Sequence, residues 1–147
     1  MDINKKRALV IPKRCASGCR MPGIWRAAAH NEGALVIFHS PKACAHVARE
    51  MDLSEYYRAA KRRELLDHNY TAPLLSSNLR DEHSIFGGEE QLSGCIDHAM
   101  QNYAPQYIVI ASSCVAGTIG DDVAAVARRA SEKWGKPVLA VPSGGFL

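Results

Sequence analysis

Cysteine side chains are the residues of this sequence whose type and position are best suited to chemistry. Cys44 and Cys114 each follow an apolar, β-branched run that is typical of a buried strand, and each lies near the start of an expected helix. Cys19 lies in a loop, rich in Gly and Pro, that leads to the first of these strands. Because a helix N-terminus favours the thiolate, which reacts or binds metal, these thiols are candidate metal ligands or reactive groups.

Cys15 and Cys95 are expected to be small packing residues instead. Cys95 lies in the middle of an expected helix, on or near its apolar face, and Cys15 lies close before the better-placed Cys19. A packing role also stays open for the other three, because burial is the commoner fate of a free cysteine. Their separations match no local ferredoxin pattern, so only the fold could bring Cys19, Cys44 and Cys114 together.

Other kinds of site have less support. A zinc deaminase would need a Pro-Cys-x-x-Cys segment, and a structural zinc site would need a Cys-x2-Cys partner for Cys15 and Cys19; the sequence has neither. Neither strong strand is followed by a Gly-rich nucleotide motif. His39 and His46 flank Cys44 and could tune a site there, although a histidine at a strand end is more often simply hydrogen-bonded.

The stretch from Tyr107 to Asp122 contains the elements that would hold Cys114. Residues 107–111 predict a strand buried on both faces, and Gly117 and Gly120 permit a tight turn. Thr118-x-x-Asp121 matches a capping box before a helix over 123–134. The thiol is therefore expected on a strand-to-helix turn at the carboxyl edge of a parallel sheet, where open α/β sheets bind ligands.

The rest of the chain continues this alternation of strands and helices. It predicts an α/β fold with three layers, a mostly parallel sheet with helices on both faces, in which 34–40 and 107–111 are central. Residues 1–33 are interpreted as an approach segment and 34–147 as a single α/β domain. Further strands are expected at 8–11, 72–79 and 137–146, and further helices at 24–33, 41–52, 54–71 and 89–103.

Composition excludes several classes of protein. The 147 residues suffice for one domain with its own core, and a formal charge of +3 is too small to indicate nucleic-acid binding. No apolar run is long enough to span a membrane, and the N-terminus is unlike a signal peptide. The five cysteines therefore indicate a cytoplasmic protein that uses thiols for metal or redox chemistry.

Four segments together resemble the nitrogenase component 1 family, in the order and at the spacing of that family. HSPKACAHV resembles its H-G-P-x-G-C segment, and SSNLRDEHSIFGGEEQL its acidic segment with Ile-Phe-Gly-Gly. SSCVAGTIGDDV resembles its Ser-x-Cys turn with Ile-Gly-Asp-Asp, and PSGGF its loop after a strand. The resemblance spans residues 19–146 and implies the Rossmann-like first domain of a nitrogenase-like subunit.

The resemblance implies an iron–sulfur protein that accepts electrons from a separate ATP-dependent iron–sulfur reductase. Carried over by motif, Cys19, Cys44 and Cys114 would be the thiolate ligands of a [4Fe–4S]-type cluster at the interface with a homologous second subunit, which would supply the missing ligand. Gly117 and Gly120 would provide backbone N–H groups toward the cluster. The chain alone is then not expected to be catalytic.

Two departures from the family pattern bear on this expectation. Ser40 and Ala43 replace glycines beside the second cysteine. Family subunits are also about three times longer, with three similar α/β domains, so we expect this chain to be a part of such a subunit or a degenerate single-domain relative. Two alternatives stay open: a domain of a scaffold that matures the nitrogenase cofactor, and a non-catalytic α/β relative that has lost the cluster.

Overall fold

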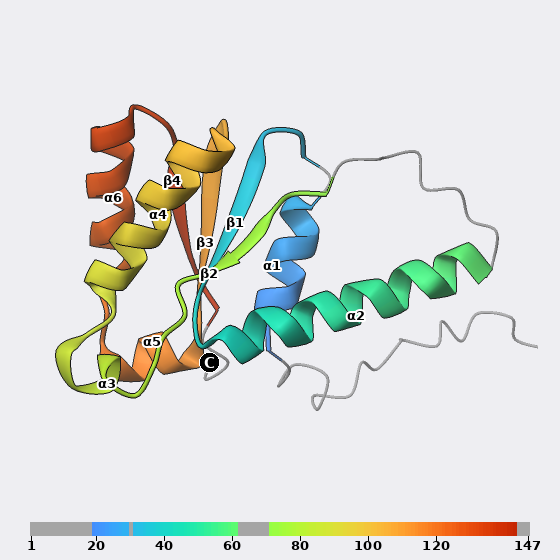
Figure 1. Cartoon of the computed structure of the whole chain (residues 1–147), viewed down its shortest axis with the longest axis horizontal. Coiled ribbons are helices and arrows are strands. Elements are labelled where there is room, and N and C mark those ends of the chain that lie inside the picture. Colours follow the sequence, from blue (N-terminus) through green and yellow to red (C-terminus); the bar gives the residue numbers. More distant parts are fainter. Residues whose placement is uncertain (1–18, 30, 62–70, 144–147) are drawn as a thin grey trace, which may run out of the picture.

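The computed structural model describes residues 19–29, 31–61 and 71–143 (Figure 1). The expected strand at 8–11, Cys15 and the last residues of PSGGF lie outside these ranges. None of the helices within them is long and apolar enough to cross a membrane. In chain order the elements are α1 (Met21–Ala28), β1 (Ala34–His39), α2 (Lys42–Lys61), β2 (Leu74–Ser76), α3 (His83–Phe86), α4 (Glu89–Tyr103), β3 (Tyr107–Ser112), α5 (Cys114–Ile119), α6 (Val123–Trp134) and β4 (Val138–Pro142).

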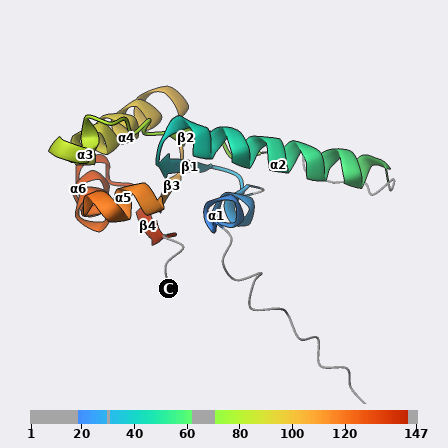
Figure 2. The ribbon, with the colours of Figure 1, turned by 90° about the horizontal axis from the view of Figure 1, so that it is seen from below.

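The four strands form one parallel sheet in the order β2-β1-β3-β4. The two strands with unbroken apolar runs are its centre, as the sequence predicts, and every residue of β1 is buried. Helices α4 and α6 cover one face of the sheet, and α1 and α2 lie on the other (Figures 1 and 2). The predicted three-layer α/β fold is therefore confirmed.

Side chains that alternate along β1 and β3 pack into two cores, one on each face of the sheet. Leu35 and Ile37 pack with Leu92 and Ile96 of α4, while Phe38 packs on the other face. Burying each such side chain contributes roughly 1.5–3 kcal/mol, so both faces need a helical cover. The second core includes Met21 and Trp25 of α1, with Val36, Val109 and Ala111 of the sheet.

Two local predictions differ from the structure. The helices expected at 41–52 and 54–71 begin as one continuous helix, α2, because no Gly or Pro interrupts the sequence between Lys42 and Lys61. The capping box at Thr118 is wrong. Ser113 caps α5 by accepting from Ala116 N, and Asp122 caps α6 by accepting from Ala125 N.

The carboxyl ends of the strands gather the segments that carry the expected chemistry. Helices α2 and α5 begin there, directly after β1 and β3, and α3 lies beside α5 (Figure 1). Helix α1 also begins at this end. We call this region, with Cys19, Cys44 and Cys114, the cysteine edge.

Candidate cysteine site at the carboxyl edge of the sheet

The three predicted ligands lie at the starts of three helices. Cys19 precedes α1, Cys44 is in the first turn of α2 with its N–H donating to Pro41 O over 3.1 Å, and Cys114 is the first residue of α5. Cys19 and Cys114 are exposed and Cys44 is partly buried, and all three are free thiols. The cysteine edge is therefore accessible from outside the chain.

Electrostatics connects the three thiols. Burial raises the pKa of the Cys44 thiol, a hydrogen bond with Ser40 lowers it, and the nearby Cys19 and Cys114 thiols raise it further. Cys44 thus lies within electrostatic reach of both other cysteines. The hydrogen bond with Cys44 is made by Ser40, one of the two residues that depart from the glycines of the resembled family pattern.

The donor set consists of thiols, which are ligands of iron–sulfur clusters as well as of single soft ions. Within residues 19–29, 31–51 and 71–143, no three Cys, His, Asp or Glu side chains converge closely enough to hold one metal ion. In a cluster each thiolate binds a different iron, so its ligand sulfurs lie farther apart than those around a single ion. Three separated thiols at one edge are compatible with that arrangement.

Gly117 and Gly120 differ in what their backbones require. Gly120 ends α5 with a φ of 87°, which favours glycine, whereas Gly117 lies inside that short helix. Their N–H groups donate to Ser113 O and Ala116 O, so neither is free for a ligand. No described atom lies within 4 Å of a Cβ built on either glycine, so the space beside them is open.

Cys95 is a packing residue, as the sequence predicts. It lies in α4 and packs against the core between that helix and the sheet. Burial raises the pKa of its thiol to about 11. A thiol held so strongly in its neutral form is a poor nucleophile and a poor metal ligand.

A buried polar network lies beneath the cysteine edge and joins His39, which the sequence offered as a tuning residue, to Asp121, which the sequence offered only as a helix cap. His39 ends β1 and is fully buried; its Nε2 lies 2.9 Å from Asp121 Oδ2, and its Nδ1 lies 2.9 Å from Ser77 Oγ. Ser77 Oγ also accepts from Ser40 N, and Asp121 Oδ1 accepts from Gly88 N over 2.8 Å. The Ser77 hydroxyl therefore donates to Nδ1, and Nε2–H donates to Asp121.

This network has the residue types of a Ser-His-Asp triad but not its accessibility. Burial lowers the pKa of His39, and its effect exceeds the opposing effect of Asp121, so the ring is neutral near pH 7. Ser77 is 1% exposed, so its hydroxyl cannot reach a substrate. The geometry therefore supports a structural role for these side chains and excludes Ser77 as a nucleophile.

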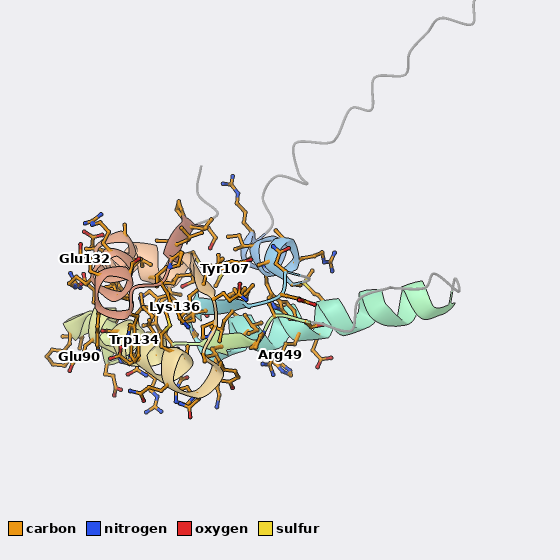
Figure 3. The ribbon with its side chains drawn as sticks, turned by 90° about the horizontal axis from the view of Figure 1, so that it is seen from above. Arg49, Glu90, Tyr107, Glu132, Trp134 and Lys136 are labelled. Carbon is orange, nitrogen blue, oxygen red and sulfur yellow. The ribbon has the colours of Figure 1, made fainter. Side chains whose placement is uncertain are left out.

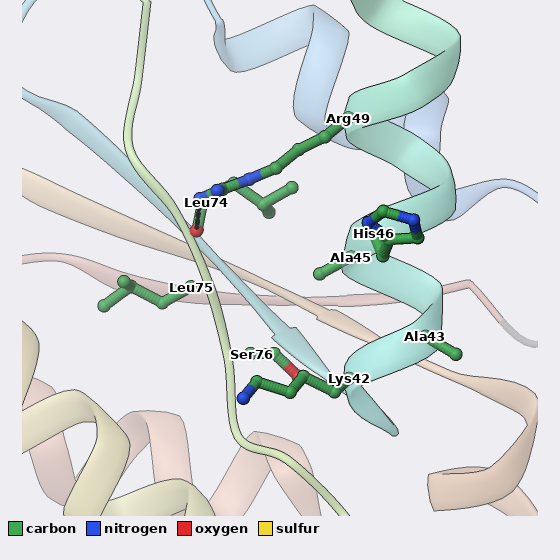
Figure 4. Close-up of a pocket in the computed structure, with 8 residues that line it drawn as sticks. All are labelled: Lys42, Ala43, Ala45, His46, Arg49, Leu74, Leu75 and Ser76. Atoms are coloured by element: carbon green, nitrogen blue, oxygen red, sulfur yellow. Dashed lines mark hydrogen bonds between the residues drawn. The ribbon is translucent and has the colours of Figure 1, made fainter.

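Two grooves of opposite charge are described on the surface. The first, of about 540 Å³, lies between α2 and the edge strand β2 (Figure 4). Its charged residues are all basic, and Arg49 Nη2 donates to Leu74 O over 2.7 Å. The second, of about 880 Å³, lies between α3, α4 and the turn after α5, and includes Glu82, Glu89 and Glu90. The first groove suits an anionic group; no pattern in the sequence pointed to it.

Comparison with known proteins decides the family. The family model described as nitrogenase component 1 type oxidoreductase matches residues 19–147. The chain belongs to this family. The resemblance of the four sequence segments is thereby confirmed.

Several relatives within the family are cofactor biosynthesis proteins. The nitrogenase iron-molybdenum cofactor biosynthesis protein NifE of Clostridium pasteurianum is 45% identical over 48% of this chain and 16% of the relative. NifE of Methanosarcina barkeri is 34% identical over 77% of this chain and 22% of the relative. The nitrogenase molybdenum-iron protein alpha chain of Acidithiobacillus ferridurans is 30% identical over 75% of this chain and 22% of the relative.

A solved structure shares the fold. Nitrogenase Cp1 at pH 6.5 superimposes with a TM-score of 0.61 and 24% identity, over 89% of this chain and 24% of that chain. Because the identity is low, the likeness shows the fold alone. The chain spans about a quarter or less of the length of these family members.

Proposed function

We propose that this chain is the cluster-binding domain of a nitrogenase-type protein. Cys19, Cys44 and Cys114 hold a [4Fe–4S]-type cluster at the cysteine edge, which when bound supplies one-electron transfer. The observation that carries the proposal is that Cys19, Cys44 and Cys114 all lie at helix starts at the carboxyl end of the sheet (Figure 1), in a chain of this family. The open space beside Gly117 and Gly120 leaves room for such a group against the backbone.

The residues of the chain would do three things. The exposed Cys19 and Cys114 thiols are accessible to a cluster from outside the chain, while Cys44, whose pKa is raised, would give up its proton when a metal replaces it. The hydrogen bond with Ser40 lowers the pKa of Cys44, and hydrogen bonds to ligand sulfurs tune the potential of a cluster. Electrons would arrive from a separate ATP-dependent iron–sulfur reductase, and any substrate chemistry lies outside this chain.

A partner subunit would complete the site. Three thiols leave one iron of a cubane without a ligand from this chain, so a homologous subunit would supply it across the cysteine edge. Apolar side chains exposed beside this edge support an interface there: Phe86 is 87% exposed and Ile85 78% exposed on α3, next to α5. Replacing both with Ser should reduce association in light scattering without loss of the circular dichroism spectrum.

The test of the cluster is anaerobic reconstitution of the purified chain with iron and sulfide. Visible absorption and bound iron should appear in the wild type, fall sharply in Cys19→Ala, Cys44→Ala and Cys114→Ala, and disappear in air. Cys95→Ala is the matched control and should load normally. Uptake that does not depend on the three cysteines would overturn the proposal.

A second candidate is a domain of a cofactor maturation scaffold, as its NifE relatives suggest. Such a chain would hold a cluster without turnover. The two candidates separate in the complete assembly. The relay candidate predicts cluster oxidation when a downstream acceptor is added after reduction, whereas the scaffold candidate predicts transfer of bound iron and sulfide to a recipient protein.

A further inference from the structure

We infer that His39 is a positioning residue that, through Asp121, holds the Cys44 and Cys114 segments at a fixed separation. The inference rests on the proposed function for its consequence, since only a shared cluster makes that separation matter. The contacts that support the inference are those of the chain without a cluster.

The contact joins the two segments that carry the central thiols. His39 is the last residue of β1, and the backbone continues through Ser40 and Pro41 into the first turn of α2, where Cys44 lies. Asp121 follows Gly120, which ends α5, the helix that Cys114 begins. The 2.9 Å contact between His39 Nε2 and Asp121 Oδ2 therefore closes a loop with one cysteine on each side.

The backbone fixes only one end of this loop. Ser113 N donates to His39 O over 3.1 Å, which continues the pairing of β1 with β3 up to the residue before Cys114. Beyond that point, in the described residues, α5 and the Cys44 turn share no sheet pairing. The Asp121 carboxylate is the connection that returns from the far end of α5 to β1.

The polar network favours one arrangement because each of its polar side-chain atoms has a hydrogen-bond partner. Both ring nitrogens of His39 and both carboxylate oxygens of Asp121 have a partner, and among the described residues no buried side-chain nitrogen or oxygen is left without one. Moving either segment would leave a polar atom buried and unpaired, which costs about 1–3 kcal/mol. Polar networks of this kind specify a geometry more than they add stability.

Gly88 completes the constraint. A Cβ at this position would lie 2.4 Å from Leu79 Cδ2, 2.7 Å from Asp121 Oδ2 and 3.0 Å from His39 Cε1. The start of α4 therefore packs directly on the network, and its N–H donates to the carboxylate. Three chain segments, from β1, from the turn after α5 and from the start of α4, thus meet at one carboxylate beneath the cysteine edge.

The chain offers a matched polar contact away from the cysteines. Asp97 of α4 accepts from Trp134 Nε1 over 2.8 Å and from Lys133 Nζ over 2.7 Å, both on α6. Trp134 marks this site in Figure 3. Like the His39–Asp121 contact, the Asp97 contact joins two elements through a carboxylate that accepts from two donors. Removing the Asp97 carboxylate therefore tests whether the loss of any such contact disturbs the chain.

The experiment measures the distance between nitroxide spin labels on Cys44 and Cys114 in the apo chain, with the other cysteines replaced by Ser. His39→Gln keeps a donor where Nε2 lies, and His39→Asn keeps only the contact at Nδ1. The distance distribution should broaden in His39→Asn and in Asp121→Asn, and should keep the wild-type width in His39→Gln and Asp97→Asn. Circular dichroism checks that each variant is folded.

An unchanged width in both His39→Asn and Asp121→Asn overturns the inference, and so does equal broadening in Asp97→Asn. If His39→Asn does not fold, Asp121→Asn decides alone. Anaerobic reconstitution of the chain with its cysteines intact adds the functional arm: the reduced cluster of His39→Asn should show a shifted electron paramagnetic resonance spectrum, and that of His39→Gln should not. Failure of the wild type to load would count against the proposed function, while the distance measurement would still decide this inference.

Discussion

The α4–α6 layer and the cysteine edge treat polar groups in opposite ways. In the layer, Asp97 and Lys133 pair at the surface, with side chains 31% and 58% exposed, above the hydrophobic core. At the edge, His39 and Asp121 pair with side chains 0% and 3% exposed, while the Cys19 and Cys114 thiols are exposed. Surface pairs contribute little to stability, whereas buried pairs define geometry. The layer therefore stabilises the domain, and on the proposed function the edge positions the three thiols.

The first way to test this contrast is to remove core volume from the layer. Leu92 of α4 is fully buried between that helix and the sheet. Leu92→Ala should lower the free energy of unfolding by about 3 kcal/mol, from lost transfer energy and the cavity left behind. Urea unfolding followed by circular dichroism measures this. The alkylation rate of Cys114 in the folded chain should stay at the wild-type value; a large change would show that the two regions are coupled.

A methyl group added at the edge should cost almost as much. Gly88→Ala places a Cβ against Leu79, Asp121 and His39, and should destabilise the chain by about 2 kcal/mol. Its control is Gly94→Ala on α4, where no described atom lies within 4 Å of the added Cβ. That change should stabilise the helix by about 0.8 kcal/mol. Equal effects in urea unfolding would contradict the close packing at Gly88.

Acidity should destabilise the edge more than the layer. Burial holds the folded-state pKa of His39 below its ordinary 6.5, against the opposing effects of Asp121 and Glu89 and with a small contribution from His83. Between that lower value and 6.5 the unfolded chain takes up a proton that the folded chain refuses, so stability falls as the pH drops below about 6.5.

His39→Gln should flatten this pH dependence, because it removes the titrating group while keeping a donor to Asp121. The unfolding free energy from urea titrations between pH 7.5 and 5 measures the slope. Asp97→Asn is the control and should keep the wild-type slope across this interval. Wild-type and His39→Gln slopes that coincide would show that His39 does not titrate differently in the two states.

The smallest effect concerns the caps beside Cys114. Asp122 accepts from Ala125 N at the start of α6, so Asp122→Ala should cost about 1 kcal/mol. Thr118 donates to Cys114 O over 2.9 Å and caps no helix, so Thr118→Ala should cost less. Thermal unfolding of the two variants measures the difference, and a larger loss in Thr118→Ala would restore the capping box that the sequence suggested.

Much of the architecture is readable from the sequence, because it depends on neighbouring residues. Continuous apolar runs identify β1 and β3 as central strands, since only a strand covered on both faces needs apolar side chains at every position. Gly135 ends α6 in a left-handed conformation, and glycine favours this in any context. The position of Cys44 and Cys114 just after strand ends follows from the same local patterns.

The contacts beneath the cysteine edge depend on tertiary structure. His39 and Asp121 are 82 residues apart, and they meet because β1 and β3 pair in parallel, so that the end of β1 lies beside the segment that follows β3. In the sequence Asp121 matches a helix cap, and only the fold shows that its carboxylate faces a buried histidine while Asp122 caps the helix. Periodicity reports which face of an element is buried, but a contact between distant polar side chains requires the strand order and register, which no local pattern contains.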